Sequence, residues 1–277
     1  MRLEGKTILV TGSTDGVGRV VAKRLAAEGA NVLIHGRSQQ RAEKVLREIC
    51  GARAEPKKGM ATFYQADFAS LAEVRGLAEA VLRDRDRIDC LVNNAGIGSG
   101  PDKNHRQLSE DGYELRFAVN YLAGFLLTRL LLPCLLESAP ARVVNISSLG
   151  QQAIDFGDVM LAKGYDGARA YCQSKLAQIM FTIDLSHEHD PKRVTANALH
   201  PATYMNTTMV RESGNAPVSS VEEGADAILK QIVSEELAGK SGLFFNGQRQ
   251  SRAIEQAYDE KARAKLKALS MRLVGLS

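Results

Sequence analysis

The chain has 277 residues, of which 44% are hydrophobic and 25% charged, and its formal net charge is +4. This length and composition are enough to bury one large core and are ordinary for a single-domain α/β enzyme. The Lys and Arg residues are scattered instead of forming one basic tract, which argues against a protein that binds nucleic acid.

Short runs of β-branched and apolar residues alternate with longer segments of helical spacing along the whole chain. This alternation is typical of βαβ units, and the apolar character of the runs indicates strands covered on both faces. The sequence therefore predicts one domain over 1–277, with a doubly wound sheet of about seven parallel strands flanked by helices. The predicted strands are 6–11, 31–35, 62–65, 90–92, 142–146, 194–199 and 242–245.

Two loops and a C-terminal helix complete the predicted domain. The segments 149–166 and 202–219 follow strands at the carboxyl edge of the sheet, where ligands bind, so we expect both to form walls of a substrate site. Apolar residues in 149–166 either line that site or anchor the loop. The basic amphipathic helix predicted over 252–273 packs on its own domain, at a subunit contact or on anionic lipid; a homo-oligomer is left open.

No membrane span or signal peptide is expected. The most apolar stretch, 121–136, contains Arg129 and Pro133 and is predicted to be a buried helix that is too short and interrupted to span a bilayer. Residues 1–6 lead directly into the first predicted strand. The widely spaced cysteines fit a reducing, cytoplasmic setting. The histidines show no ligand spacing, so no metal is expected.

The first predicted strand ends at Thr11, and a glycine-rich turn follows over 12–18. Gly12 lets the strand turn sharply, Gly16 lets backbone approach a pyrophosphate, and Gly18 lets the next helix sit close to the sheet. That helix offers free N–H groups and a positive dipole end to an anion. A dinucleotide is therefore predicted to bind at Gly12, Ser13, Thr14, Asp15, Gly16, Val17 and Gly18.

The spacing of this turn, Thr-Gly-x-x-x-Gly-x-Gly, resembles that of the short-chain dehydrogenase/reductase superfamily, which has a Rossmann-type fold. The second strand is followed by Arg37, and no acidic residue occurs until Glu43. Because a guanidinium can pair with a 2′-phosphate, this favours NADP(H) over NAD(H). Asp15 either caps the following helix or turns towards Arg37. Ser38 is predicted to cap the helix that follows Arg37, with phosphate binding as the alternative or an additional role.

Tyr171 and Lys175 are the predicted centre of the chemistry. They lie four residues apart on a predicted helix and therefore share one face. A cation beside a phenol favours its phenolate, so Lys175 is expected to lower the pKa of Tyr171 and make it an acid/base. The resemblance also implies that Lys175 holds the nicotinamide ribose.

The resemblance to this superfamily implies further site residues. Ser148, with Ser147 as the alternative, would bind the substrate oxygen. Asn120 would hold a water that connects Lys175 to solvent, or else mark a capped or kinked helix. Asp67 would meet the adenine together with Phe68, or simply cap a helix. The remaining predicted cofactor contacts are Asn94, Ala95, Gly96 and Pro201; the residue after Pro201 that meets the carboxamide is not assigned.

The long gap between Ser148 and Tyr171, with the motif 171–177, resembles the retinol-dehydrogenase-like branch of this superfamily. The sequence thus predicts an NADP(H)-dependent oxidoreductase that interconverts an apolar carbonyl compound and its alcohol. The alternatives are an NAD-dependent alcohol dehydrogenase and a catalytically silent nucleotide-binding regulator.

Overall fold

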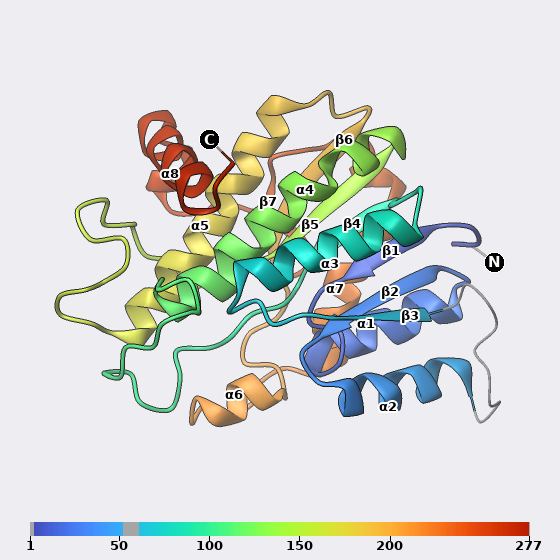
Figure 1. The fold of residues 1–277 in the computed structure, drawn as a ribbon, viewed down its shortest axis with the longest axis horizontal. Coiled ribbons are helices and arrows are strands. Elements are labelled where there is room, and N and C mark those ends of the chain that lie inside the picture. The colour runs from blue at the N-terminus through green and yellow to red at the C-terminus, as the bar shows by residue number, and fades with distance from the viewer. Residues whose placement is uncertain (1–2, 52–60, 277) are drawn as a thin grey trace.

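The computed structural model of the chain describes residues 3–51 and 61–276; Met1 and Arg2, which precede the first predicted strand, lie outside the described residues. An eight-stranded sheet lies between two layers of helices (Figure 1), with strand order β3-β2-β1-β4-β5-β6-β7-β8. The strands are β1 Thr7–Val10, β2 Asn31–Gly36, β3 Ala61–Gln65, β4 Cys90–Asn93, β5 Ala141–Ile146, β6 Val194–His200, β7 Phe244–Asn246 and β8 Arg249–Ser251.

The seven predicted strands are all present and pair in parallel. The additional strand, β8, pairs antiparallel with β7 through a two-residue turn. Gly247 in this turn has φ +57°, a left-handed conformation that glycine adopts without strain. The three residues of β8 are exposed, so they lack the apolar pattern by which the other strands were predicted.

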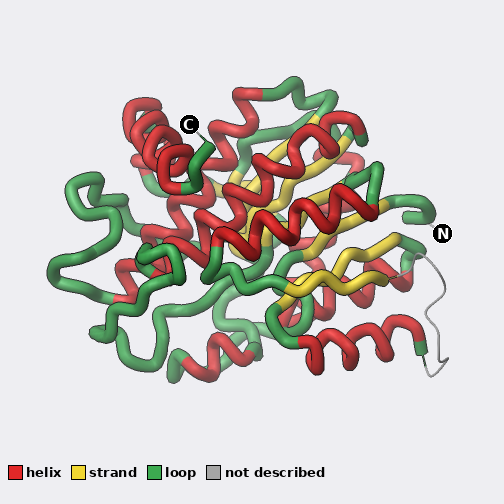
Figure 2. The backbone as a smooth tube through the Cα atoms, viewed as in Figure 1, coloured by secondary structure: helices red, strands yellow, loops and turns green. Residues whose placement is uncertain are grey.

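The helices cover both faces of the sheet and enclose two hydrophobic cores. One face carries α1 (Gly16–Ala27), α2 (Gln39–Cys50) and α7 (Val221–Val233). The other face carries α3 (Leu71–Asp84), α4 (Ala123–Glu137) and α5 (Gly167–Glu188). The long loops gather at one end of the sheet (Figure 2), and one of them contains the short helix α6 (Thr208–Glu212).

A π-helical segment, η1 (Phe117–Leu122), runs directly into α4. The combined helix Phe117–Glu137 has 21 residues and is apolar enough to cross a membrane, but 72% of its most apolar window is buried inside the domain. The expectation of a buried helix is therefore met. The expectation that it is too short is wrong, because the helix begins at Phe117, before the apolar stretch 121–136.

The C-terminal helix α8 spans Glu260–Leu273 and packs on its own domain, beside α5 in Figure 1. It begins later than the predicted 252, because a 3-10 turn, η3 (Glu255–Tyr258), precedes it and Asp259 caps its first turn. Arg263 is buried and its guanidinium lies 2.8 Å from the Asp184 carboxylate. The hydroxyls of Tyr121 and Ser270 are 2.7 Å apart, which ties the helix to η1.

Several apolar residues anchor the loop 149–166 to the core. Ile154 and Leu161 are buried in the core, and Phe156, Val159 and Met160 pack against the same core. These contacts support the anchoring interpretation for five of the apolar residues in this loop.

Candidate active site

The candidate site lies where the strand order reverses on either side of β1. The carboxyl ends of β1, β4, β5 and β6 meet there, together with the N-terminus of α1 and the first turns of α5. Residues predicted for cofactor and substrate contact follow each of these strands, so the fold brings them to one edge of the sheet.

The glycine turn packs directly on the turn that follows β4. A Cβ on Gly12, whose φ is +63°, would lie 2.7 Å from the Cα of Ala95, and one on Gly18 would lie 2.5 Å from the Gly12 carbonyl oxygen. The Asn94 amide donates to the carbonyls of Thr11 and Gly12 at 2.8 and 3.0 Å. Only glycine fits these two positions, which lets the glycine turn pack closely on the turn after β4.

In the glycine-rich turn, the side chains of Ser13 and Val17 face the protein interior. Ser13 is fully buried; its hydroxyl donates to the Val10 carbonyl at 2.7 Å and accepts from the His35 N–H at 3.1 Å. Val17 belongs to the core between the sheet and α1. These two side chains therefore stabilise the turn, and a cofactor contact at either residue would be made by its backbone.

His35, on β2, is a structural residue of the turn that sequence reasoning missed. Its Nδ1 accepts from the Gly12 N–H at 3.1 Å, and its Nε2 lies 3.1 Å from the Ala66 carbonyl oxygen. Its ring stacks on Phe68, with 4.3 Å between centroids. Phe68 is buried in this stack, so its side chain helps to hold the turn, and the adenine contact of Asp67 and Phe68 stays a prediction. The one signal for this role in the sequence is a histidine at the end of an apolar strand.

Acidification is expected to loosen this turn. Burial lowers the pKa of His35 from 6.5 to about 4, and a proton on Nδ1 would face the Gly12 N–H. Between these pH values the unfolded chain binds the proton and the folded chain does not, so the free energy of unfolding falls as the pH drops from 6.5 towards 4. Urea unfolding at several pH values measures this slope.

His35→Asn should reduce that slope by about one proton, although burial gives His200 the same direction of pKa shift. The exposed His105 supplies the matched control, His105→Asn, whose slope should equal that of the unmodified chain. A slope unaffected by the His35 substitution would contradict the assignment.

Asp15 caps α1 and turns towards Arg41. Its Oδ1 accepts from the Gly16 N–H at 2.7 Å, and its Oδ2 lies 3.3 Å from the Arg41 guanidinium and 2.9 Å from the Thr208 hydroxyl. The first alternative in the sequence analysis is therefore confirmed. The second is wrong, because Arg37 faces a different carboxylate.

Arg37 is exposed and pairs with Asp67 at 3.4 Å. Asp67 does not cap a helix, since α3 begins at Leu71 and the Asp67 carboxylate accepts from the Ala69 N–H. Ser38 caps α2 as predicted, because its hydroxyl accepts from the Arg41 N–H at 3.3 Å. The ion pair joins the ends of β2 and β3 beside the glycine turn.

A cavity of about 230 Å³ opens between the glycine turn, α2 and α6. Three of its side chains are cationic, which fits an anionic group placed beside the α1 N-terminus. Arg41 was not predicted; its place in the first turn of α2, four residues after Arg37, is the only hint in the sequence. The lining residues are Thr14, Asp15, Arg19, Arg41, Lys44, Val45 and Thr208.

Ser148 and Tyr171 meet at the other end of the site. Their side chains are hydrogen-bonded, and the Ser148 Oγ also accepts from the Gly150 N–H at 3.0 Å. Ser147, the alternative, is buried and donates to the Lys175 carbonyl at 2.7 Å. Ser148 is therefore the serine that faces the phenol.

The side chain of Lys175 reaches back to the end of β5. Its ammonium donates to the Ile146 carbonyl at 2.8 Å and to the Gln178 amide oxygen at 3.0 Å, and lies 5.7 Å from the centroid of the Tyr171 ring. Burial lowers the pKa of Lys175 to about 7. The same burial raises the pKa of Tyr171, which its hydrogen bond from Ser148 only partly offsets.

The expected lowering of the Tyr171 pKa is thus absent from this structure. The lysine and the phenol share a helix face as predicted, but the ammonium is engaged by Ile146 and Gln178 and is itself partly deprotonated near neutral pH. Desolvation of the phenol is the larger effect.

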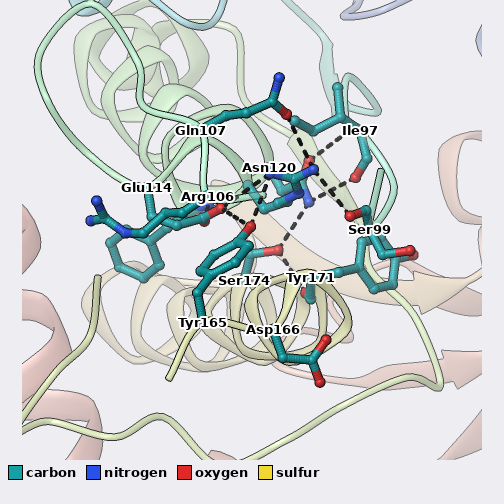
Figure 3. A network of polar contacts seen from close by, with 12 residues as sticks. Ile97, Ser99, Arg106, Gln107, Glu114, Asn120, Tyr165, Asp166, Tyr171 and Ser174 are labelled. Atoms are coloured by element: carbon teal, nitrogen blue, oxygen red, sulfur yellow. Dashed lines mark hydrogen bonds and ion pairs between the residues drawn. The ribbon is translucent and has the colours of Figure 1, made fainter. Parts of the chain in front are cut away.

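Asn120 lies in η1 and connects two parts of the site (Figure 3). Its amide oxygen accepts from the Ile97 N–H at 2.7 Å, and its amide nitrogen donates to the Ile97 carbonyl and to the Ser174 hydroxyl at 3.1 and 2.9 Å. Ser174 in turn donates to the Tyr171 carbonyl. A Cβ on Gly96 would lie 3.1 Å from the Asn120 Oδ1 and 3.5 Å from the Lys175 Nζ, so this glycine keeps the space beside both groups open.

Pro201 follows β6 at the same edge of the sheet and is buried. The residues after it are engaged within the protein: the Thr203 hydroxyl lies 3.0 Å from the His200 Nε2, and Thr207 caps α6. The structure therefore does not single out one of them for a carboxamide. Within residues 3–51 and 61–276, no three His, Cys, Asp or Glu side chains gather as metal ligands would.

Comparisons with known proteins identify the family of the chain. The family model for short chain dehydrogenases matches residues 6–217. Retinol dehydrogenase 13 of Mus musculus is 39% identical over 293 aligned positions, which cover 99% of this chain and 85% of the relative. Retinol dehydrogenase 14 of Homo sapiens is 34% identical, covering 99% and 88%.

Solved structures show the same fold. A putative uncharacterized protein from Mycobacterium Paratuberculosis has a TM-score of 0.75 and 27% identity, covering 98% of this chain and 94% of that one. The Pseudomonas aeruginosa RhlG/NADP active-site complex has a TM-score of 0.70 and 28% identity, covering 88% and 95%. The chain therefore belongs to the short-chain dehydrogenase/reductase superfamily, in its retinol-dehydrogenase-like branch.

Proposed function

We propose that the chain is an NADP(H)-dependent oxidoreductase that interconverts an apolar ketone or aldehyde and its alcohol, with Tyr171 as the acid/base. The observation that carries this proposal is the hydrogen-bonded pair of Ser148 and Tyr171 beside the buried Lys175, at the sheet edge that also holds the glycine turn. A polar pair in a partly buried setting can bind an oxygen and exchange a proton with it.

The proposed mechanism assigns each side chain one task. In the reducing direction the hydroxyls of Ser148 and Tyr171 hold the carbonyl oxygen, and Tyr171 donates its proton to that oxygen. The raised pKa of Tyr171 keeps this proton in place at neutral pH. Lys175 lies beside the phenol, and its pKa of about 7 suits a group that returns a proton near neutrality. A bound NADPH would supply the hydride.

The cofactor preference rests on charge. Arg37 stands at the end of β2, and Arg41 and Lys44 line the cavity next to the glycine turn. These cations fit a 2′-phosphate, for which Arg37 and Arg41 would exchange their present carboxylate partners. The solved RhlG complex, 28% identical to this chain, contains NADP. NAD(H) is the alternative outcome of the tests below.

The apolar substrate class is supported by two exposed side chains near the catalytic pair. Leu149 directly follows Ser148 and is 46% exposed, and Tyr204 is 49% exposed and close enough to Tyr171 to influence its pKa. Apolar and aromatic groups next to a few polar ones are typical of a small-molecule site. We also propose a cytoplasmic location, which rests on the cysteine usage alone.

Turnover of a panel of aldehydes and ketones of graded size, followed by NADPH consumption, tests this function. Consumption that rises with the apolar size of the substrate is expected. If none of the compounds causes NADPH to be consumed, the proposal is contradicted and a silent regulator is favoured. Turnover with NADH alone would favour the NAD-dependent alternative.

Arg37→Asp should weaken NADPH binding by about a hundredfold and NADH binding by less than about threefold, because only the 2′-phosphate loses a cation and gains a repulsive charge. The chain has no tryptophan, so the fluorescence of the bound nicotinamide can be read with little protein background. Arg47→Asp makes the same charge change at the other end of α2 and should leave both affinities nearly unchanged. Equal losses for the two cofactors in Arg37→Asp would refute the assignment.

A further inference from the structure

A buried ion pair, which the mechanism above does not use, lies between the loops of the site. The Arg116 guanidinium and the Glu114 carboxylate are 3.5 Å apart, and their side chains are only 2% and 1% exposed. Burying two charges is costly unless their remaining hydrogen-bonding groups are satisfied. The partners that satisfy them are therefore informative.

Arg116 holds the loop that follows β4. Its Nη2 donates to the Ser99 carbonyl at 3.0 Å and its Nε to the Gly98 carbonyl at 3.3 Å. A Cβ on Gly100 would lie 2.4 Å from the same guanidinium, so only glycine lets the loop close around it. This loop contains Ile97, whose backbone is bound by Asn120.

Glu114 holds the start of η1 and the end of the loop 149–166. One carboxylate oxygen accepts from the Phe117 N–H at 2.7 Å, and the other accepts from the Tyr165 hydroxyl at 3.0 Å (Figure 3). The Arg116 Nη1 donates to the same hydroxyl at 3.0 Å. Burial and the neighbouring Glu114 raise the pKa of Tyr165, so its hydroxyl stays protonated and donates.

Tyr165 immediately precedes Asp166, the N-cap of α5, and lies six positions before Tyr171 in the sequence. The first residue of α5, Gly167, donates to the Lys103 carbonyl at 2.7 Å, and a Cβ on it would lie 2.4 Å from the Ser99 oxygen. The helix that carries Tyr171 thus begins directly on the loop that Arg116 holds.

We propose that Glu114, Arg116 and Tyr165 form a clamp that positions the catalytic groups. The clamp joins three segments: the loop 97–107, the π-helical segment with Asn120, and the start of α5 with Tyr171. It acts through these segments and touches no reacting atom, so its members are positioning residues. This inference rests on the proposed function.

Tyr165→Phe is the sharpest test, because it removes the hydroxyl that both charges share and leaves the ion pair in place. Removal of either charge alone would strand the other in the interior and could prevent folding. Tyr113→Phe is the matched control, since Tyr113 directly precedes Glu114 but its hydroxyl donates to the Leu273 carbonyl in α8 and not to a side chain of the clamp. Arg116→Lys, which keeps the charge but loses the planar fork, is the second variant.

For Tyr165→Phe we expect kcat to fall by about tenfold to a hundredfold, as small misplacements of reacting groups do, with NADPH affinity within about twofold. Amide hydrogen exchange should become faster in 97–107 and 149–166 than in Tyr113→Phe. Arg116→Lys should show the same split between kcat and affinity. A purely stabilising contact would lower the melting temperature in both tyrosine variants and change turnover in neither.

The clamp is overturned if Tyr165→Phe matches Tyr113→Phe in kcat and in the exchange of both loops. If the unmodified chain turns over no carbonyl compound, the proposed function fails, and the exchange comparison alone decides on the clamp.

Discussion

Tyr171→Phe is expected to lower kcat by about a thousandfold, because a positioned acid contributes on the order of 10² to 10⁴ to such a rate and Ser148 alone would remain on the substrate oxygen. Phenylalanine keeps the ring in its partly buried place on α5, and the Ser148 hydroxyl keeps its bond from the Gly150 N–H. NADPH affinity should therefore stay within about threefold. Single-turnover and steady-state rates with the best substrate of the panel, together with nicotinamide fluorescence, measure both quantities.

The matched control for this substitution is Tyr64→Phe. The Tyr64 hydroxyl donates to the Asp84 carboxylate at 3.2 Å, between β3 and the end of α3, so the variant also loses one hydroxyl but at a distance from the site. Its kcat should equal that of the unmodified chain. If Tyr171→Phe retained more than about a tenth of the unmodified rate, Tyr171 would not be the acid.

The pKa shift of Tyr171 also predicts that neutral pH favours carbonyl reduction over alcohol oxidation. A phenol whose pKa burial has raised holds its proton at pH 7 and can give it to a carbonyl oxygen. Alcohol oxidation needs the deprotonated phenol, so its rate should rise as the pH increases above neutrality. Burial disfavours the charged form of each group, so it lowers the pKa of Lys175 while it raises the pKa of Tyr171.

The parts of the site that depend on one short segment could be predicted from the sequence. The glycine turn and the pair Tyr171 and Lys175 have fixed spacings, and the sheet edge on which they meet follows from the alternation of strands and helices. Ser148 could be placed because it follows the end of β5, at the position that the family resemblance implies. In each case the spacing within one element determines which atoms lie together.

The parts of the site that depend on residues far apart in the chain could not be predicted from the sequence. The Gly12 N–H is bound by His35 on another strand, and Arg116 donates to the Tyr165 hydroxyl, 49 positions away in the sequence. Charged residues usually face solvent, so nothing in the sequence marks Arg116 as buried. The direction of the Tyr171 pKa shift was missed for a related reason: it depends on desolvation, which the packing of surrounding segments determines.

Gly18→Ala is expected to weaken NADPH binding by about a hundredfold or more and to lower the free energy of unfolding by about 2 kcal/mol, because there is no space for a methyl group. Its Cβ would lie 2.4 Å from the Asn94 amide nitrogen and 2.5 Å from the Gly12 carbonyl oxygen. The second neighbour is backbone of the turn itself, and the first is bonded to Thr11 and Gly12. The turn must therefore move to make room, which displaces the N–H groups that a pyrophosphate would use.

Gly76→Ala gives the control for this change. Gly76 lies exposed in the interior of α3, and a Cβ there would have nothing within 4 Å. This variant should be more stable by about 0.5–1 kcal/mol, since alanine is the better helix former, and should bind NADPH as before. Fluorescence titration well below the melting temperature separates affinity from stability. If Gly18→Ala bound NADPH as tightly as Gly76→Ala, the glycine turn would not be the phosphate site, because a ligand seated on that backbone cannot be indifferent to its displacement.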